Sequence, residues 1–225
     1  RKQLLLKTLY AFVANSSTLD DLDCFSMFGT NSFNLVWERV CADVLDNQLQ
    51  KPIGGLHLPV PLAEQYQDIR HKELGDLIDK PEWIGEDPDK GSFSKTAEHT
   101  LIPDLITIAN VNGEYQFIIF DAKYYNLVLE PDKSLRGQPG IESITKQYLY
   151  QLAYQPFVEA HGIRTVKNCF LMPTAGNEVV AKGKVSLAML SNLHLQDIQI
   201  RLVPAKMVYQ HYLGNTKMDL HALML

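Results

Sequence analysis

Residues 101–124 read LIPDLITIANVNGEYQFIIFDAKY, and this stretch decides the fold. Two runs rich in Ile, Phe and Tyr, Leu101–Ala109 and Glu114–Tyr124, flank the dipeptide Asn112-Gly113. Runs of this kind on both sides of an Asn-Gly pair are typical of a β-hairpin with a two-residue turn. We therefore expect two antiparallel strands here.

The predicted turn also sets which side chains face each other. A two-residue turn pairs Val111 with Glu114, and the following pairs come one for one along both strands. Asp104 then lies opposite Asp121, with Cβ atoms about 5 Å apart. Lys123 projects from the same face as Asp121, because side chains alternate along a strand. The register therefore predicts a cluster of two carboxylates and one lysine.

Two facing carboxylates repel each other, and a divalent cation between them would remove that repulsion. Oxygen ligands at this spacing suit Mg²⁺ or Mn²⁺. A lysine beside the ion would orient water or stabilise charge that develops on a phosphate. The alternative is a surface hairpin whose charges are solvated, since Pro-Asp and Asp-x-Lys are each common by chance.

A helix is predicted before the hairpin, from about Ser32 to Asn47, because its apolar side chains form one stripe. The stripe consists of Phe33, Val36, Trp37, Val40, Cys41 and Val44. Glu38 lies at the edge of this stripe. It either points inward to a neighbouring metal or extends to water, and the spacing leaves both interpretations open.

A second helix is predicted after the hairpin, from Ile141 to about Ala160. Its apolar side is expected to hold Ile141, Ile144, Tyr148 and Leu152. An adjacent face carries amides and phenols, namely Gln147, Tyr150, Gln151 and Tyr154. These groups either bond a phosphate or steady the lysine, or they form an ordinary amphipathic boundary.

The remaining elements complete a mixed α/β pattern. Further strands are expected at Thr165–Met172, Val179–Met189 and Ile198–Val203, followed by a short helix between Pro204 and Gly214. Another helix is expected near the start, at Lys2–Ala14. The alternation of one helix with one strand that marks a βαβ repeat is not present.

Composition excludes several classes of protein. With 46% hydrophobic and 21% charged residues, the 225-residue chain has the makeup of a globular domain. No apolar run reaches the roughly 18 residues of a membrane span. The 3 cysteines form no CxxC pair, which favours a reduced, cytoplasmic protein. A net charge of −5 argues against gripping nucleic acid by charge alone, and no phosphate-binding glycine loop is present.

At these residues the sequence resembles the PD-(D/E)xK nuclease superfamily. Pro103-Asp104 matches the first half of its motif, and Asp121-Ala122-Lys123 matches the second. The resemblance implies an α/β fold with a central mixed sheet flanked by helices, in the order α-β-β-β-α-β. It implies that the first core strand lies between about Leu56 and Thr100.

The same resemblance implies the roles of individual residues. Asp104 and Asp121 would hold Mg²⁺ or Mn²⁺ with the Ala122 carbonyl and Glu38, which matches a glutamate often supplied by the preceding helix. Lys123 would act at the reacting phosphate. Gln147 and Tyr150, with Tyr154, match the helix that follows the motif and would support the site.

A narrower resemblance comes from Phe28-Gly29-Thr30-Asn31-Ser32-Phe33 and Val36-Trp37-Glu38. This segment is similar to the LlaJI-type restriction endonucleases, which are organised like McrC, the nuclease partner of the McrB motor. It implies a subunit that cuts double-stranded DNA with a separate McrB-like AAA+ GTPase motor. Residues 31–225 would form the nuclease domain, and residues 1–30 a helix and linker that end a preceding region.

Two other functions remain open at this point. One is a non-catalytic DNA-binding or assembly module on the same scaffold. The other is a nuclease of DNA repair or recombination.

Overall fold

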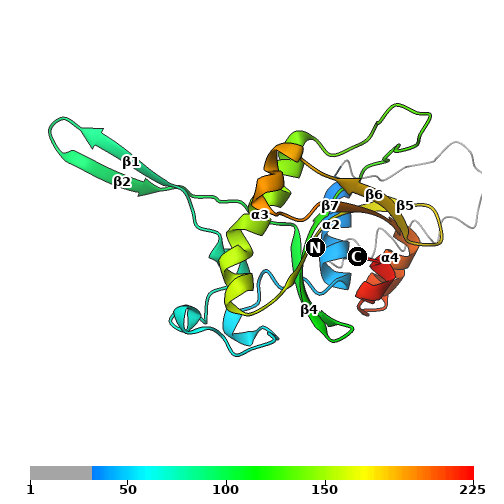
Figure 1. Cartoon of the computed structure of the whole chain (residues 1–225), viewed down its shortest axis with the longest axis horizontal. Helices are drawn as coiled ribbons and strands as arrows, with labels where there is room; N and C mark the ends of the chain where they lie inside the picture. Colours follow the sequence, from blue (N-terminus) through cyan, green and yellow to red (C-terminus); the bar gives the residue numbers. More distant parts are fainter. Residues whose placement is uncertain (1–31) are drawn as a thin grey trace, which may run out of the picture. The chain divides into compact units, whose positions relative to one another are not determined.

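A five-stranded mixed sheet in the order β3-β4-β5-β7-β6 organises residues 32–225, which are the residues that this computed structural model describes (Figure 1). Its strands are β3 (Leu105–Val111), β4 (Glu114–Ala122), β5 (Thr165–Thr174), β6 (Val180–Val185) and β7 (Ile198–Pro204). β4, β5 and β7 run parallel, whereas β3 and β6 are antiparallel to their neighbours. The predicted α/β fold with a central mixed sheet is thus confirmed.

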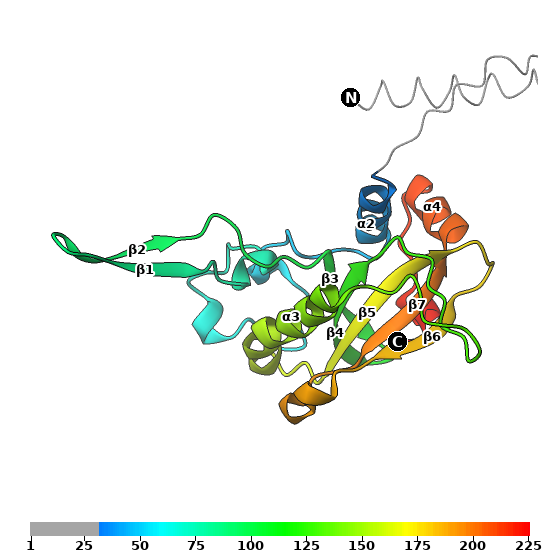
Figure 2. The same cartoon turned by 90° about the horizontal axis from the view of Figure 1, so that it is seen from above.

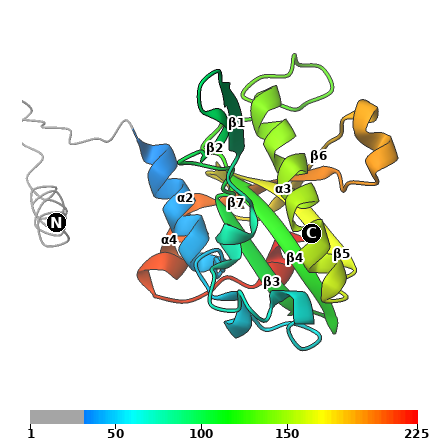
Figure 3. The same cartoon turned by 90° about the vertical axis from the view of Figure 1, so that its left-hand side faces the viewer.

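Three helices cover the two faces of this sheet: α2 (Phe33–Val44), α3 (Ile141–Ala160) and α4 (Ala205–Leu213). α2 and α4 lie on one face and α3 lies on the other (Figure 3). The faces follow from the alternation of β4, in which Ile118 and Phe120 pack toward α2 while Phe117 and Ile119 pack toward α3. Asp121 therefore belongs to the α3 side of the sheet.

Five short 3₁₀ turns complete the described chain, at Ile53–Gly55, Glu64–Tyr66, Leu74–Leu77, Ala188–Leu193 and Leu220–Leu223. None of the helices in residues 32–225 is long and apolar enough to cross a bilayer. The helix expected at Lys2–Ala14 and the first residues of the Phe28–Phe33 segment lie outside the described residues.

The expectation of a first core strand between residues 56 and 100 is wrong. The strands of that region, β1 (Glu82–Asp87) and β2 (Gly91–Thr96), form a separate two-stranded sheet. They extend away from the five-stranded sheet as a hairpin (Figure 2). No strand pairs with the outer edge of β3 in the described chain.

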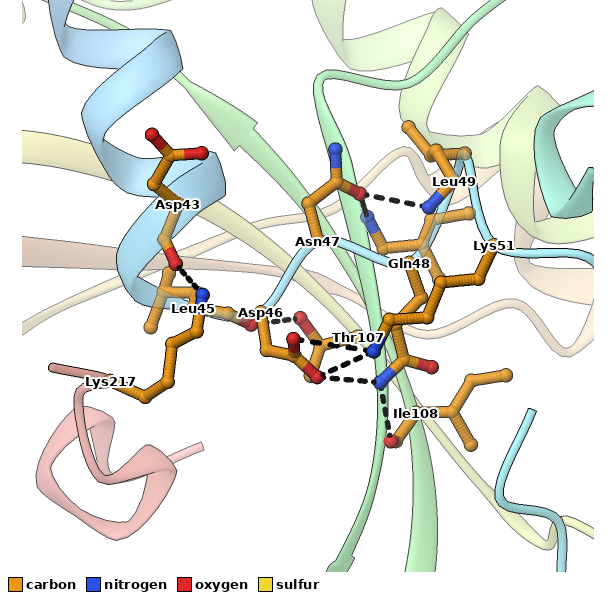
Figure 4. Close-up of polar contacts among 11 residues, drawn as sticks. Asp43, Leu45, Asp46, Asn47, Gln48, Leu49, Lys51, Thr107, Ile108 and Lys217 are labelled. Atoms are coloured by element: carbon orange, nitrogen blue, oxygen red, sulfur yellow. Dashed lines mark hydrogen bonds and ion pairs between the residues drawn. The ribbon is translucent and has the colours of Figure 1, made fainter. Parts of the chain in front are cut away.

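The segment that follows α2 forms hydrogen bonds with the backbone groups on the outer edge of β3 instead (Figure 4). The backbone N–H of Gln48 donates to the Ile106 carbonyl at 2.8 Å, and its side-chain amide donates to the Ile108 carbonyl at 3.0 Å. The Asn47 side chain accepts from the Ile106 N–H at 3.1 Å. These bonds replace the ladder that a sixth strand would form, because an edge strand leaves its N–H and C=O groups unpaired.

The end of α2 is set by the same segment. The helix stops at Val44 rather than at the expected Asn47, and Asp46 adopts a left-handed backbone conformation, φ 55°. The Thr107 hydroxyl donates to the Leu45 carbonyl at 2.7 Å, which adds a bond between the helix end and β3. α2 is therefore fixed relative to the strand that leads out of Asp104.

Three other expectations need correction. The strand expected at Val179–Met189 ends at Val185, and a 3₁₀ turn follows. The expected apolar side of α3 is confirmed only in part, because Tyr148 is buried but Ile141 is 62% exposed, and the adjacent face with amides and phenols is buried as well. Phe33 and Val36 of the α2 stripe are each 38% exposed. The short helix between Pro204 and Gly214 is confirmed.

Candidate active site

The turn between β3 and β4 has the predicted length and register. Asn112 and Gly113 have φ angles of 55° and 87°, as a two-residue hairpin turn requires. The backbone ladder runs from Val111↔Glu114 to Leu105↔Phe120. Asp104 is the next residue on its strand, and it therefore comes level with Asp121 where the ladder ends.

Asp104 extends this ladder with its side chain. Its Oδ2 accepts a hydrogen bond of 2.9 Å from the backbone N–H of Ala122. The bond holds the Asp104 carboxylate against the end of β4, beside Asp121. The cross-strand pair of carboxylates that the register predicts is thus formed, with Ala122 between them as a backbone donor.

Asp121 is a buried carboxylate, only 5% exposed. Its Oδ1 meets the Lys123 ammonium at 2.7 Å as an ion pair. Burial and then the charge of Asp104 raise the pKa of Asp121, the hydrogen bond and charge of Lys123 lower it, and the net result is a pKa of about 7. The pair of carboxylates therefore resists carrying two negative charges in the absence of a cation.

Lys123 is the positive charge of this cluster, with a side chain 21% exposed. Burial lowers its pKa, but contact with Asp121 and the charge of Asp104 outweigh burial, so the pKa of Lys123 is raised above its ordinary value. Lys123 is therefore an ammonium near neutral pH. It donates charge and hydrogen bonds rather than acting as a base.

Glu38 lies near the cluster without joining it. Burial and then the charge of Asp104 raise the pKa of Glu38, while the charge of Lys123 and a hydrogen bond with Asn34 lower it less. Among residues 32–225, no group of three or more His, Cys, Asp or Glu side chains is close enough to hold a metal ion. The structure thus brings Glu38 into electrostatic reach of Asp104, and its role as a ligand stays a prediction.

On the polar face of α3, some side chains form hydrogen bonds with the protein and one does not. Gln151 accepts from the Asn168 side chain at 2.8 Å and from the Gln196 N–H at 3.0 Å, and the Tyr154 hydroxyl donates to the Leu74 carbonyl at 3.2 Å. These two residues are structural. Gln147 is fully buried, and neither its Oε1 nor its Nε2 has a hydrogen-bond partner in the described chain.

Tyr150 supports Asp104 through the backbone. Its hydroxyl donates to the Ile102 carbonyl at 2.9 Å, two residues before Asp104. Burial raises the pKa of Tyr150 to about 12, and the charges of Asp104 and Asp121 contribute. Tyr150 therefore stays protonated and holds the segment that presents Asp104.

A cavity of about 890 Å³ opens beside this cluster, with Asp104 and Glu38 in its wall. Its charged lining has six carboxylates and three Arg or Lys side chains. The carboxylates are Glu38, Glu73, Asp76, Asp79, Glu98 and Asp104, and the cations are Arg39, Lys72 and Lys80. A cavity with this balance attracts cations more strongly than free phosphates.

The residues of the cluster fit a divalent metal of the Mg²⁺ type. Asp104 and Asp121 supply two adjacent carboxylates, and the Oδ1 of Asp121 is buried beside the Lys123 ammonium. Mg²⁺ is typically bound by one or two carboxylates and keeps several waters for exchange with substrate phosphates. A closed cage of three or four side chains, as structural zinc needs, is not available among residues 32–225.

Several residues at the site escaped the sequence analysis. Asn34 bonds Glu38, Tyr125 adds to the charge around Lys123, and segment 72–80 lines the cavity. Segment 72–80 had no periodic pattern, so only the hydrophobic Leu74 and Ile78 signalled that it packs on the core. His99 lines the cavity as an exposed loop residue.

Comparison with known proteins identifies similarity to restriction enzymes. The profile of the LlaJI restriction endonuclease family matches residues 65–207. The chain is 30% identical over 193 residues to the Type II restriction enzyme BsuMI component YdjA of Bacillus subtilis (strain 168), which covers 84% of this chain and 34% of that protein. The chain thus spans about a third of the length of this relative. No solved structure matches it. On the family profile, the relative and the restriction-endonuclease-like sheet together, the chain belongs to the LlaJI restriction endonuclease family.

Proposed function

We propose that this chain is the nuclease of a restriction system, a cytoplasmic enzyme that hydrolyses phosphodiester bonds of double-stranded DNA with Mg²⁺ or Mn²⁺. The observation that carries the proposal is the convergence of Asp104, Asp121 and Lys123 at one end of the β3–β4 hairpin, beside an acid-rich cavity. The product would carry a 5′-phosphate by analogy with the superfamily.

Each residue of the cluster has a role that its surroundings support. Asp104 and Asp121 would hold the metal, with the Ala122 carbonyl and Glu38 as further ligands. When bound, a divalent cation supplies Lewis-acid polarisation and makes water more acidic. The Lys123 ammonium, paired with Asp121 at 2.7 Å, stabilises negative charge on the reacting phosphate.

Two buried residues of α3 support the cluster of Asp104, Asp121 and Lys123. Tyr150 positions Asp104 through its bond to the Ile102 carbonyl. Gln147 lies on the buried face of α3 with its amide unsatisfied, and it would orient Lys123 or a water in the loaded site. A buried amide without partners costs free energy, which supports a polar group beside it in the working enzyme.

The partner in this proposal is a separate McrB-like AAA+ GTPase motor. The net charge of −5 gives the chain little electrostatic grip on DNA, so affinity and movement along the duplex would come from the motor. The curated relative is itself named a component of a restriction enzyme, which supports an assembly of several chains.

Calorimetry with Mn²⁺ tests the site. The wild-type chain should bind Mn²⁺, and Asp121→Ala should lose that binding because Asp104 alone offers too few ligands. Asp132→Ala, which removes an exposed carboxylate from the loop before α3, is the matched control and should bind as the wild type.

Plasmid nicking then tests the activity, with the motor present and absent. Unchanged Mn²⁺ binding in Asp121→Ala would refute the metal site. Intact metal binding together with a wild-type chain that never cuts DNA, even with its motor, would support a non-catalytic module instead.

A further inference from the structure

The β1–β2 hairpin has no buried residue of its own. All residues of Glu82–Asp87 and Gly91–Thr96 are exposed or half-buried. Its large apolar side chains are among the exposed ones: Trp83 is 70% exposed, Ile84 73% and Phe93 46%. A two-stranded ribbon is marginally stable in water, and exposed apolar side chains on it gain nothing in the free protein. The hairpin therefore has the character of a surface that another molecule covers.

Its apolar side chains are arranged on both faces. The register pairs Trp83 with Lys95 and Gly85 with Phe93, so Trp83 and Phe93 share one face as diagonal neighbours. The Phe93 ring lies over Gly85, where an added Cβ would come within 2.6 Å of it. Ile84 occupies the opposite face. The hairpin can thus be gripped from both sides.

The base of the hairpin is held firmly and leads to the candidate active site. The Ala97 N–H donates to the Pro81 carbonyl at 2.8 Å, and the Thr100 hydroxyl donates to the Asp79 carbonyl at 2.6 Å. The chain then continues along the wall of the cavity to Asp104. The base of the hairpin therefore borders the cavity, while β1 and β2 themselves extend away from the five-stranded sheet (Figure 2).

The charge of the hairpin selects the kind of molecule. Four carboxylates stand against two lysines, and they are Glu82, Glu86, Asp87 and Asp89 against Lys90 and Lys95. The four carboxylates would repel the phosphates of DNA. A second copy would bring two acidic hairpins together. A partner surface that is apolar and bordered by basic side chains would match both the exposed apolar side chains and the acidic charge of the hairpin.

We propose that the β1–β2 hairpin is a docking arm that inserts into an apolar groove, rimmed by Lys and Arg, on another protein subunit of the restriction system. The inference rests on the proposed function for the choice of that subunit, the co-encoded motor. It does not depend on the metal site, because no residue of the arm lines the cavity.

Binding of the full chain to the purified motor, measured by calorimetry, tests the arm. Ile84→Ser should weaken binding at least about tenfold, as for a central apolar contact. Glu86→Lys should also weaken binding, through charge. The matched controls are Leu213→Ser, which removes a side chain 82% exposed on α4, and Glu178→Lys in the β5–β6 loop. Both controls should bind as the wild type.

Fluorescence gives a second measurement. Trp83 is 70% exposed and Trp37 is fully buried, so docking should shift the emission of Trp83 to shorter wavelength and protect it from acrylamide. Trp83→Phe identifies that signal. The change should be smaller when Ile84→Ser is mixed with the motor at the same concentration, in line with its weaker binding.

Three results would overturn the docking arm. The first is motor binding that both arm variants leave unchanged, or that is absent in the wild type. The second is a loss of DNA binding in the arm variants without the motor, and the third is a change in their molecular mass in sedimentation. Metal-dependent nicking by Ile84→Ser alone should equal that of the wild type, so failure of the nuclease proposal is read separately.

Discussion

At the scale of single residues, the grouping of side chains at the candidate site was predictable because it is local. Asp104, Asp121 and Lys123 lie within one hairpin, and the register of a two-residue turn follows from Asn112-Gly113. The burial of Asp121 and its pKa of about 7 were not predictable, because they depend on α3 covering that face. The position of Glu38 was not predictable either, because it depends on the hydrogen bonds that hold the end of α2 against β3.

Removing the Lys123 ammonium should stop cleavage without removing the metal. Lys123→Ala should lower the cleavage rate on the order of a hundredfold or more, because a positioned charge at the reacting phosphate is lost. Its affinity for Mn²⁺ by calorimetry should be kept. Lys184→Ala is the control, since Lys184 also pairs with a carboxylate at 2.7 Å but on the surface. Wild-type rates in Lys123→Ala would reduce the motif to coincidence.

The metal-free protein should lose stability as the pH rises from about 4 to about 7. An unfolded aspartate has a pKa near 3.9, whereas burial raises that of Asp121 to about 7. Between these values the folded state binds a proton that the unfolded state has released, so the free energy of unfolding falls with rising pH. The loss has an upper bound on the order of 4 kcal/mol.

Thermal unfolding of the wild type and Asp121→Asn in a chelator measures this effect. The substitution should be increasingly stabilising as the pH rises through that window, and excess Mg²⁺ should stabilise the wild type alone. A difference between the two proteins that is independent of pH would contradict the assignment.

At the scale of elements, periodicity predicted what packs through apolar side chains and missed what packs through polar ones. Burial of the amide and phenol face of α3 was missed, because Gln151 pays no penalty inside the protein when it accepts hydrogen bonds from Asn168 and Gln196. The outer edge of β3 was assigned to a strand, whereas Asn47 and Gln48 satisfy it. No hydrophobic pattern marks side-chain amides that replace a strand.

Gln48 should therefore matter for stability although it lies outside every strand. Gln48 is only 6% exposed, and Gln48→Ala removes the side-chain amide that donates to the Ile108 carbonyl at 3.0 Å. The free energy of unfolding should fall by about 1–3 kcal/mol, as for other buried unsatisfied groups. Denaturant unfolding of Gln48→Ala beside the exposed Gln50→Ala measures the difference, and equal midpoints would show that the amide adds nothing.

At the scale of the whole molecule, the sequence predicted the fold class and the family, and the order of the sheet had to come from the structure. The sheet order arises from long-range pairing of β5 with β7 and of β6 with β7, for which the chain carries no local signal. The β1–β2 hairpin was unreadable for a related reason, because polar and apolar residues do not alternate on a ribbon without a core.

The isolated nuclease should cut poorly and with little preference for sequence. An acid-rich chain with a net charge of −5 is repelled by DNA at low salt, whereas the proposed motor would hold the duplex at high effective concentration. Adding the co-encoded motor and nucleotide should raise both the rate and the specificity in a cleavage assay. Efficient, specific cutting by the nuclease alone would refute the subunit role and leave the metal-dependent nuclease intact.

The two-residue turn at Asn112-Gly113 has a consequence for how this family tolerates insertions. Leu105–Ile108 of β3 is buried on both faces, so hydrophobicity alone does not resist a slip of that strand by one position. Register then depends on the turn, which lies about 23 Å from the carboxylates it aligns, and on the hydrogen bonds from Asn47 and Gln48 to the outer edge of β3. One added codon there would rotate Asp104 to the opposite face and silence the nuclease without touching its active site. Relatives that remain active should keep this turn at constant length, while the exposed segment 129–135 can vary in length.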